Sequence, residues 1–444
     1  MQIIPRNEHN ISRSQISDAA LKVLYRLRKA GYEGYLVGGG VRDLLLQGNP
    51  KDFDVATDAT PEDVRRLFRN CRLIGRRFRL AHVHFGDEII EVATFRGQHQ
   101  GDQGDAGQIV NGMIVRDNVY GTLEEDAWRR DFTVNSLYYN IADFSLVDHV
   151  GGMEDIQARR LRMIGDPEVR YNEDPVRMLR AVRFAAKLGF SIEQHTEEPM
   201  VRLAHLLVDV PPARLFEEVL KLFLSGYAQR TFELLDKYHL FAQLFPQAQD
   251  GVDHQQRFRN FIGAALANCD QRIAEGKSVT PAFVFAVLLW YPVQHLREHF
   301  MERGETESQA MSEAANAVLG GQSQRVSIPR RFHVMIKEIW HLQDRLGKRA
   351  PKRSARLLSH PRFRAGYDFL LLRAQVGEVE AELAQWWTEF AQAGDAHQEK
   401  MVRNFRHHGA GAGAAAGADA PVKKRRRRRS NARRSAGPIN QNED

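Results

Sequence analysis

The spacing of apolar residues divides this 444-residue chain into two parts of different character. In the first 150 residues, short apolar runs such as Tyr35-Leu36-Val37 alternate with glycine-rich or polar turns, which is typical of strands. Residues 17–30 instead carry leucines at helical spacing. From Pro211 to about Gln392 nearly every segment has helical spacing, and residues 283–290 are apolar enough to form a fully buried helix. The pattern therefore predicts an α+β region followed by an all-helical region.

Local signals set the boundaries of several predicted elements. Thr60 is expected to cap a helix over residues 61–70 that has proline at its first position. Gly86-Asp87 is expected to join two strands as a hairpin. Another helix is predicted to open at Asp174-Pro175 and to end at Gly189.

Residues 124–140 are predicted to form one continuous helix. Trp128 and Phe132, four residues apart, would be its core anchors. Asp131 and Asn135 would share another face of the same helix.

Composition limits the class of protein. Hydrophobic residues make up 43% of the chain and charged residues 27%, as in ordinary globular proteins, and the length predicts two to four domains. No stretch approaches the roughly 18–20 apolar residues of a membrane-spanning helix, and the N-terminus lacks a secretory signal pattern. The two cysteines, Cys71 and Cys269, fit a reducing compartment and provide no zinc site or disulfide framework. We therefore expect a cytoplasmic protein.

Positive charge is concentrated at the C-terminal end of the chain. The nine basic residues between 423 and 434 exceed the whole net charge of +7, so the rest is slightly acidic. They follow a Gly/Ala-rich run, which predicts a flexible linker and a disordered cationic tail over residues 405–444. Residues 97–121 are also polar and glycine-rich, and we expect a mobile loop there.

One stretch near the N-terminus combines two kinds of candidate chemistry. Gly38, Gly39 and Gly40 follow a predicted strand and precede a helical pattern, so backbone N–H groups can approach a phosphate. Asp52 and Asp54 follow, two residues apart in a β-prone run, so both carboxylates are expected on one face of a strand. Two such charges are stable together mainly when a cation lies between them, and Mg²⁺ prefers oxygen ligands. The combination suggests phosphoryl or nucleotidyl transfer.

Other charged residues nearby have two readings each. Glu91 interrupts an apolar run and is either a third metal ligand or an edge-strand residue. Seven arginines between residues 65 and 79 form either a solvated face or a contact for a polyanion, and we favour the polyanion. Arg129 and Arg130, with Asp131, form either an ordinary surface pairing or a triphosphate clamp, and the upstream carboxylates favour the clamp.

Four motifs, in order, carry a family resemblance: GGGVRD, KDFDV, RRDFTVNSLYY and EDPVRMLRAVRFAAKLGF. They resemble the motif series of the class II nucleotidyltransferases, which include tRNA CCA-adding enzymes and bacterial poly(A) polymerases. LIGRRFRLAHV, at residues 73–83, and the arginine-rich C-terminus look like the poly(A) polymerase branch. The resemblance is strong over residues 14–250 and looser beyond.

The resemblance implies an α+β fold with a DNA polymerase β-like nucleotidyltransferase head, built on a small mixed sheet. Helical neck, body and leg domains and the disordered basic tail would follow. We expect a catalytic head at residues 14–150, a neck that binds nucleotide and RNA at 151–250, an RNA-binding helical domain at 251–400 and the tail at 405–444.

The resemblance also implies roles for individual residues. Asp52 and Asp54 match metal-binding catalytic carboxylates, and Asp131 matches a third active-site acid. The expected nucleotide-binding residues are Gly38, Gly39, Arg42, Arg129, Arg130, Asn135, Asp174, Arg177 and Arg180. The expected RNA-binding residues are Arg76, Arg77, Arg79, Arg425, Arg426 and Arg427.

The expected activity is template-independent addition of AMP from ATP to RNA 3′ ends, with Mg²⁺ as cofactor. The alternatives are a CCA-adding enzyme that stops after three nucleotides and a non-catalytic RNA-binding protein. Intact Asp52, Asp54 and Asp131 disfavour the non-catalytic reading, and the basic tail disfavours CCA addition. Expected partners are RNA 3′ ends and ATP, with RNA-degradation or RNA-chaperone proteins as further candidates, and the expected state is a monomer.

Overall fold

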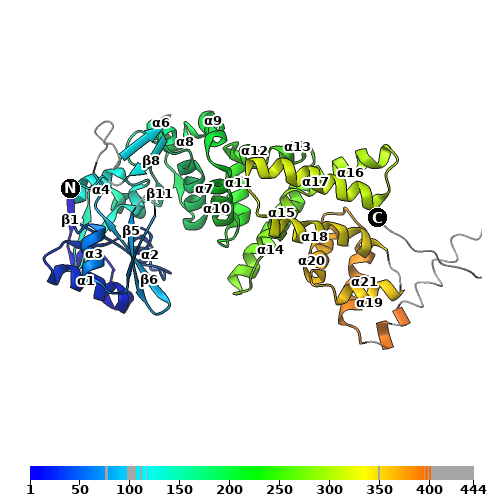
Figure 1. Cartoon of the computed structure of the whole chain (residues 1–444), viewed down its shortest axis with the longest axis horizontal. Coiled ribbons are helices and arrows are strands. Elements are labelled where there is room, and N and C mark those ends of the chain that lie inside the picture. Colours follow the sequence, from blue (N-terminus) through cyan, green and yellow to red (C-terminus); the bar gives the residue numbers. More distant parts are fainter. Residues whose placement is uncertain are drawn as a thin grey trace, which may run out of the picture.

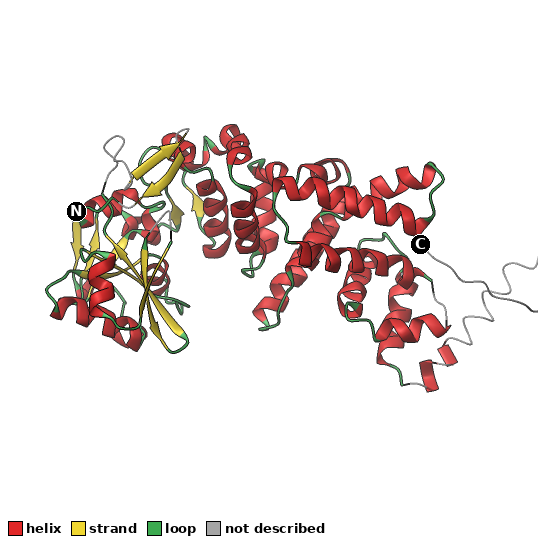
Figure 2. Cartoon of the chain, viewed as in Figure 1, coloured by secondary structure: helices red, strands yellow, loops and turns green. Residues whose placement is uncertain are grey.

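The computed structural model describes residues 1–401 except 76–78, 98–106, 111–112, 118, 349–350, 395 and 399. The molecule is elongated, with a sheet-bearing part at one end and helices extending to the other (Figures 1 and 2). Among the described residues, no helix has both the length and the apolar character needed to cross a bilayer.

An eight-stranded mixed sheet forms the N-terminal part, with the strand order β1-β10-β9-β2-β3-β6-β5-β4. Neighbouring strands are antiparallel except β3 and β6, which run parallel. Its strands are β1 (Gln2–Ile4), β2 (Gly34–Val37), β3 (Asp54–Thr57), β4 (Cys71–Ile74), β5 (Leu80–Phe85), β6 (Glu88–Thr94), β9 (Leu137–Asn140) and β10 (Leu146–Asp148). The helices associated with it are α1 (Asp18–Lys29), α2 (Gly39–Leu45), α3 (Pro61–Leu67) and α4 (Leu123–Arg129).

The predicted local signals shape this part. Ser17 caps α1, whose buried side chains include Val23, Leu24 and Leu27 and join the core under the sheet. Thr60 caps α3 in a reciprocal arrangement with Asp63, as expected, although that helix ends at Leu67. The predicted hairpin at Gly86-Asp87 is confirmed by the antiparallel pairing of β5 and β6.

Helices account for nearly all the regular structure beyond the sheet, as the apolar spacing predicts. They are α5 (Gly152–Gln157), α6 (Pro167–Glu173), α7 (Val176–Leu188), α8 (Gln194–Glu197), α9 (Met200–Leu203), α10 (Pro212–Phe223), α11 (Ala228–Lys237), α12 (Leu240–Leu244), α13 (Pro246–His254), α14 (Gln256–Ala274), α15 (Pro281–Leu288), α16 (Trp290–Glu302), α17 (Glu307–Arg325), α18 (Arg330–Gly347), α19 (Pro351–Leu358), α20 (Phe363–Gln375) and α21 (Ala381–Gln392). A short parallel pair, β11 (Arg160–Leu161) and β12 (Ser191–Ile192), joins the segment before α6 to the end of α7. The residues of α15 from Ala282 to Leu288 are all buried, but the run over residues 283–290 breaks at Leu289 into two helices.

The prediction of one helix over residues 124–140 is wrong. The helix α4 ends at Arg129, because Arg130 has an extended backbone with ψ 170°. Leu137, Tyr138 and Tyr139 then form part of β9, which lies between β2 and β10, and all three side chains are buried. Three consecutive buried residues suit a strand covered on both faces better than one helix face.

Two further predictions in this region are corrected. Trp128 is 46% exposed and is no core anchor, whereas Phe132 is fully buried as expected. Part of the expected mobile loop at residues 97–121 is a two-stranded antiparallel hairpin, β7 (Gly107–Val110) and β8 (Met113–Asp117). Composition hid this hairpin because its strands are separated and flanked by polar, glycine-rich sequence.

Candidate active site

The turn between β2 and α2 brings the backbone close to charged side chains. Gly38 has φ +78°, in the left-handed region that favours glycine, and α2 starts directly after it. A Cβ atom at Gly38 would lie 3.4 Å from Asp54 Oδ2 and 3.9 Å from Arg130 Nη1. The same glycine turn therefore lies beside an acid and an arginine that are far apart in sequence.

Asp54 is the first residue of β3, and its register partners are Val37 on β2 and Glu91 on β6. Asp52 does not belong to the strand, so the expected strand containing both acids is corrected: Asp52 lies in the loop that leads into β3. The buried Phe53 side chain between the two acids packs against Gly40 and anchors this loop.

The electrostatics of Asp54 reflect a concentration of acids. Burial raises the pKa of Asp54 to about 6, with further contributions from Glu91 and Asp52, and Arg130 opposes the shift. Hard carboxylate oxygens that repel one another in this way form a donor set suited to Mg²⁺.

Glu91 lies near this acid pair but is not an edge residue. Its strand, β6, is interior, with β3 on one side and β5 on the other. Its Oε1 atom lies 3.2 Å from His82 Nε2 on β5. Among the residues that the structure describes, no group of three acid, histidine or cysteine side chains has metal-binding geometry.

Arg129 and Arg130 line a cavity of about 130 Å³ at the end of α4, together with Ala93, Arg96 and Asp126. Arg129 Nη1 donates to the carbonyl of Gly97. Sequence reasoning missed Arg96 and Asp126, since neither lies in the part of a motif used for the resemblance. The cavity contains three arginines and one acid, which is a favourable environment for a polyanion.

Asp131 is held by bonds from three directions. Arg180 on α7 donates to Asp131 Oδ2 at 2.5 and 2.7 Å, while Asn135 Nδ2 and the backbone N–H of Phe132 donate to Oδ1. Burial alone would raise the pKa of Asp131, but these donors, Arg180 foremost, lower it to about 2. Asp131 and Asn135 therefore do meet, although through a 3₁₀ turn (Thr133–Asn135) rather than the expected helix.

Arg42 differs from the expected phosphate contact. Its side chain is 2% exposed, and its guanidinium donates to Asp43 Oδ1 and, at 2.5 Å, to Asn135 Oδ1. It also lies 5.2 Å from the ring centre of Phe184 on α7. These contacts make Arg42 a buried support for the segment that carries Asp131, and Lys187 on α7 adds a bond to Asp43.

The neck residues Asp174 and Arg177 lie at the start of α7, each with a partner that the sequence did not indicate. Asp174 Oδ2 accepts a bond from Arg214 at 2.7 Å, and Arg177 Nη1 donates to Glu173 Oε2 at 2.8 Å. Arg170 on α6 donates to the carbonyl oxygens of both Arg129 and Arg130, at 2.7 and 2.6 Å. Helix α6 is thus bonded directly to the arginine pair at the end of α4.

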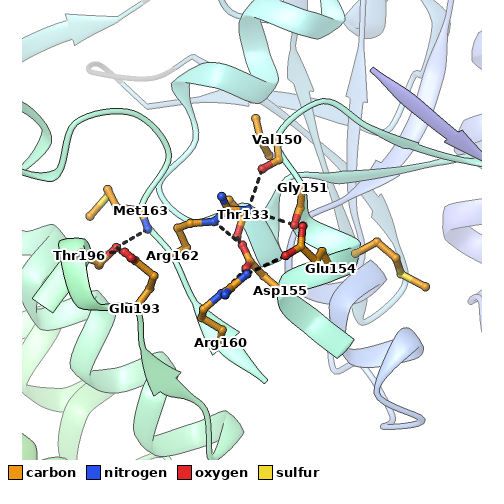
Figure 3. A network of polar contacts seen from close by, with 12 residues as sticks. Thr133, Val150, Gly151, Glu154, Asp155, Arg160, Arg162, Met163, Glu193 and Thr196 are labelled. Atoms are coloured by element: carbon orange, nitrogen blue, oxygen red, sulfur yellow. Dashed lines mark hydrogen bonds and ion pairs between the residues drawn. The ribbon is translucent and has the colours of Figure 1, made fainter. Parts of the chain in front are cut away.

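A second buried network, around Asp155, supports the 3₁₀ turn at Thr133–Asn135 that follows Asp131 (Figure 3). The Asp155 side chain is fully buried, and it accepts bonds from the Thr133 hydroxyl, Arg160 Nε and Arg162 Nε, each at 2.7 Å. Backbone bonds from Thr133 N–H to the Arg162 carbonyl and from Ile164 N–H to the Asp131 carbonyl continue it. The segment with Asp131 is therefore fixed on both sides.

The predicted RNA-binding arginines are only partly described. Arg79 is paired with Glu62 at 2.9 Å, so the acids at the start of α3 balance part of the cluster. Arg66 pairs with Asp63 in the same way. Arg76, Arg77, Arg425, Arg426 and Arg427 lie outside the described residues.

Three family models match the chain. The one described as "Poly A polymerase head domain" matches residues 34–162 and contains the whole constellation of acids and arginines from the head. "Probable RNA and SrmB- binding site of polymerase A" matches residues 189–251, and "Polymerase A arginine-rich C-terminus" matches 303–434.

Known proteins give the same picture. Poly(A) polymerase I of Salmonella typhimurium is 54% identical over 415 residues, which is 90% of this chain and 88% of that protein. The same enzyme of Haemophilus influenzae is 46% identical over 90% of each chain. A CCA-adding enzyme of Bacillus pumilus is 35% identical over 54% of this chain and 58% of its own. Among solved structures, the Bacillus stearothermophilus CCA-adding enzyme in complex with CTP is 26% identical, has a TM-score of 0.55, and is matched over 88% of this chain and 82% of its own.

Proposed function

This chain belongs to the bacterial poly(A) polymerase family, and we propose that Asp52, Asp54 and Arg130 form the centre of its active site. The chain is a polynucleotide adenylyltransferase that adds AMP from ATP to RNA 3′ ends without a template. The observation that carries the site assignment is the meeting of Asp54 and Arg130 at Gly38. An acid and an arginine beside the same glycine turn provide opposite charges for a metal ion and for a triphosphate.

Asp52 and Asp54 would hold divalent metal, which we propose to be Mg²⁺. Bound there, the metal would lower the pKa of the RNA 3′-hydroxyl and neutralise charge on the departing pyrophosphate. The oxygen donor set supports this assignment. The pKa of Asp54, which burial raises most and which Glu91 and Asp52 raise further, supports it too, since a cation would relieve the repulsion.

The other residues bind and orient the nucleotide. The N–H groups of Gly38 and Gly39 and the guanidiniums of Arg129 and Arg130 would bind the triphosphate. Asp131 would act beside them as the third acid, in the orientation fixed by Arg180 and Asn135. Arg42 supports this arrangement from inside the protein.

The adenine base would be read by the neck. Asp174 and Arg177 lie at the start of α7, and Arg214 and Glu173 fix their carboxylate and guanidinium groups. Hydrogen-bond donors and acceptors held in this way can discriminate between bases, because an unmatched base leaves them unpaired.

We further propose the head, neck, helical domain and tail boundaries given above, and a monomeric cytoplasmic enzyme. RNA would be bound by the neck and by the arginine-rich tail, which is also the candidate contact for RNA-degradation or RNA-chaperone proteins. The match of residues 189–251 to a probable RNA-binding family model supports the neck assignment.

Extension of a 3′-hydroxyl RNA with Mg²⁺ and each nucleoside triphosphate separately tests this function. Long ladders with ATP and little product with CTP are expected. Addition that requires CTP and stops at CCA on tRNA would assign the chain to the CCA-adding enzymes instead. No extension with any nucleotide would leave only RNA binding.

A further inference from the structure

The guanidinium of Arg130 is held by two side chains that have no role in the account so far. Asp126 Oδ2 accepts bonds from Arg130 Nε and Nη2 at 3.1 and 3.0 Å. The Tyr138 hydroxyl accepts a bond from Arg130 Nε at 2.9 Å and donates its own proton to Asp126 Oδ2 at 2.7 Å. The three groups thus form a closed triangle of hydrogen bonds.

Each group in this triangle has a fixed role as donor or acceptor. Burial raises the pKa of Tyr138, with a further contribution from Asp126, so the hydroxyl remains a donor. Burial alone would raise the pKa of Asp126, but Arg130 and Tyr138 lower it, so it remains an ionised acceptor. Asp126 Oδ1 is itself fixed by the backbone N–H of Arg96 at 3.2 Å.

The residues of the triangle come from a helix and a strand of the N-terminal part. Asp126 lies in the first turn of α4, Arg130 directly follows that helix, and Tyr138 lies on β9 between β2 and β10. The Tyr138 side chain is fully buried, and its ring centre lies 5.3 Å from the guanidinium carbon of Arg130. The ring and the hydroxyl therefore fix both the plane and the rotation of the guanidinium.

The triangle uses Nε and Nη2 of Arg130 and leaves Nη1 outside it. Nη1 is the atom that lies 3.9 Å from a Cβ built at Gly38, with Asp54 Oδ2 beside the same point. The edge of Arg130 that faces the glycine turn and the acid pair is therefore the edge that the triangle does not occupy.

We propose that Tyr138 and Asp126 are positioning residues for the adenylyl transfer reaction, which hold Arg130 with its Nη1 edge directed at the triphosphate of ATP. This rests on the proposed function, in which Arg130 binds the triphosphate. An unrestrained arginine would lose side-chain entropy each time it bound ATP, and the triangle removes that cost in advance.

The change Tyr138→Phe tests this, because it removes one hydroxyl and keeps the ring. We expect the KM for ATP to rise about fivefold to tenfold, as for loss of a typical intramolecular hydrogen bond. The KM for the RNA primer should not change, since Arg130 would bind only the nucleotide. A purely structural role for Tyr138 would lower the active fraction and leave the KM for ATP as it was.

Tyr139→Phe is a matched control. Tyr139 is the next residue on β9 and is equally buried, but among the residues that the structure describes its hydroxyl has no hydrogen-bond partner. Loss of that hydroxyl should leave both KM values unchanged. An equal rise in the KM for ATP in both variants would overturn the proposal.

Arg130→Ala separates this inference from the proposed function. If Arg130→Ala leaves the KM for ATP and the rate unchanged, the proposed role of Arg130 is wrong. If Arg130→Ala raises that KM and Tyr138→Phe does not, only the positioning role is wrong. In the Arg130→Ala background, Tyr138→Phe should add less than twofold, and a full further rise of fivefold would contradict action through Arg130. Asp126→Asn, which keeps the shape and removes the charge, should raise the KM for ATP at least as much as Tyr138→Phe.

Discussion

Arg180→Ala is the substitution whose effect on stability follows most directly from the geometry. It removes the cation that donates two bonds to Asp131 and leaves that carboxylate, which is 12% exposed, without its main partner. The pKa of Asp131 is lowered from 3.8 to about 2, and a shift of about 1.8 pKa units corresponds to about 2.5 kcal/mol. Arg180 is about one third exposed, so solvent screens part of this interaction energy. We therefore expect the free energy of unfolding of Arg180→Ala to fall by about 2 kcal/mol.

The assay is thermal unfolding of Arg180→Ala and of a matched variant, Arg183→Ala. Arg183 lies on the same helix and contacts the same Phe184 ring, at 4.8 Å against 5.3 Å for Arg180. Its Nε is buried, and within the described part of the chain it has no hydrogen-bond partner. For a cooperative unit of head and neck, a loss of 2 kcal/mol lowers the midpoint by about 4–8 °C. Arg183→Ala should shift it by less than half as much.

The difference in stability between wild type and Arg180→Ala should depend on pH in one direction only. Because the pKa of Asp131 is lowered in the folded protein, the ion pair stabilises it above about pH 4 and this contribution is lost as the pH falls toward 2. The gap between wild type and Arg180→Ala should stay constant from pH 8 to pH 5 and narrow below pH 4. An unchanged midpoint for Arg180→Ala, or equal shifts for both variants, would refute the reasoning.

Three other changes have clear expectations. Asp52→Ala and Asp54→Ala should each abolish AMP addition in a gel extension assay. The melting midpoint should stay within about 2 °C of the wild-type value, because loss of a carboxylate relieves repulsion between the acids. A much lower midpoint would argue against a metal site. Deletion of residues 420–444 should weaken RNA binding and flatten its dependence on salt in a filter-binding titration, whereas an unchanged slope would assign the tail to another partner. Arg42→Gln should lower the melting midpoint by about 6 °C or more, since it leaves Asp43 and Asn135 without a buried donor. Its control is Lys187→Ala, because Lys187 is exposed and also bonds to Asp43. Equal shifts in the two variants would contradict the internal role of Arg42.

The sequence predicted those features that depend on local chemistry. A capping threonine before proline marks the start of α3, and Gly189, with φ +67°, ends α7 as a left-handed glycine should. The turn at Gly38 was predictable because a strand, glycines and a helical pattern follow one another.

The errors arose where contacts distant in sequence decide the structure. The spacing over residues 124–140 fits a helix locally, but β2 and β10 pair with the second half of this segment as β9, and sheet pairing outweighs the helical spacing. Arg42 lies in the glycine motif, yet its partner Asn135 is 93 residues away, so its burial could not be foreseen. Asp126 and Tyr138 gave no signal at all, since an acid in a first helical turn and a tyrosine in a strand are both common.

A change of metal preference tests the central claim most directly, namely that Asp54 holds the metal ion for AMP transfer. The measurement is the rate of AMP addition by wild type and by Asp54→Cys, with Mg²⁺ and with the softer ions Mn²⁺ and Cd²⁺. A thiolate binds soft ions and disfavours Mg²⁺, so Asp54→Cys should be inactive with Mg²⁺ and regain part of its activity with a soft ion. Full activity of Asp54→Cys with Mg²⁺ would contradict the assignment.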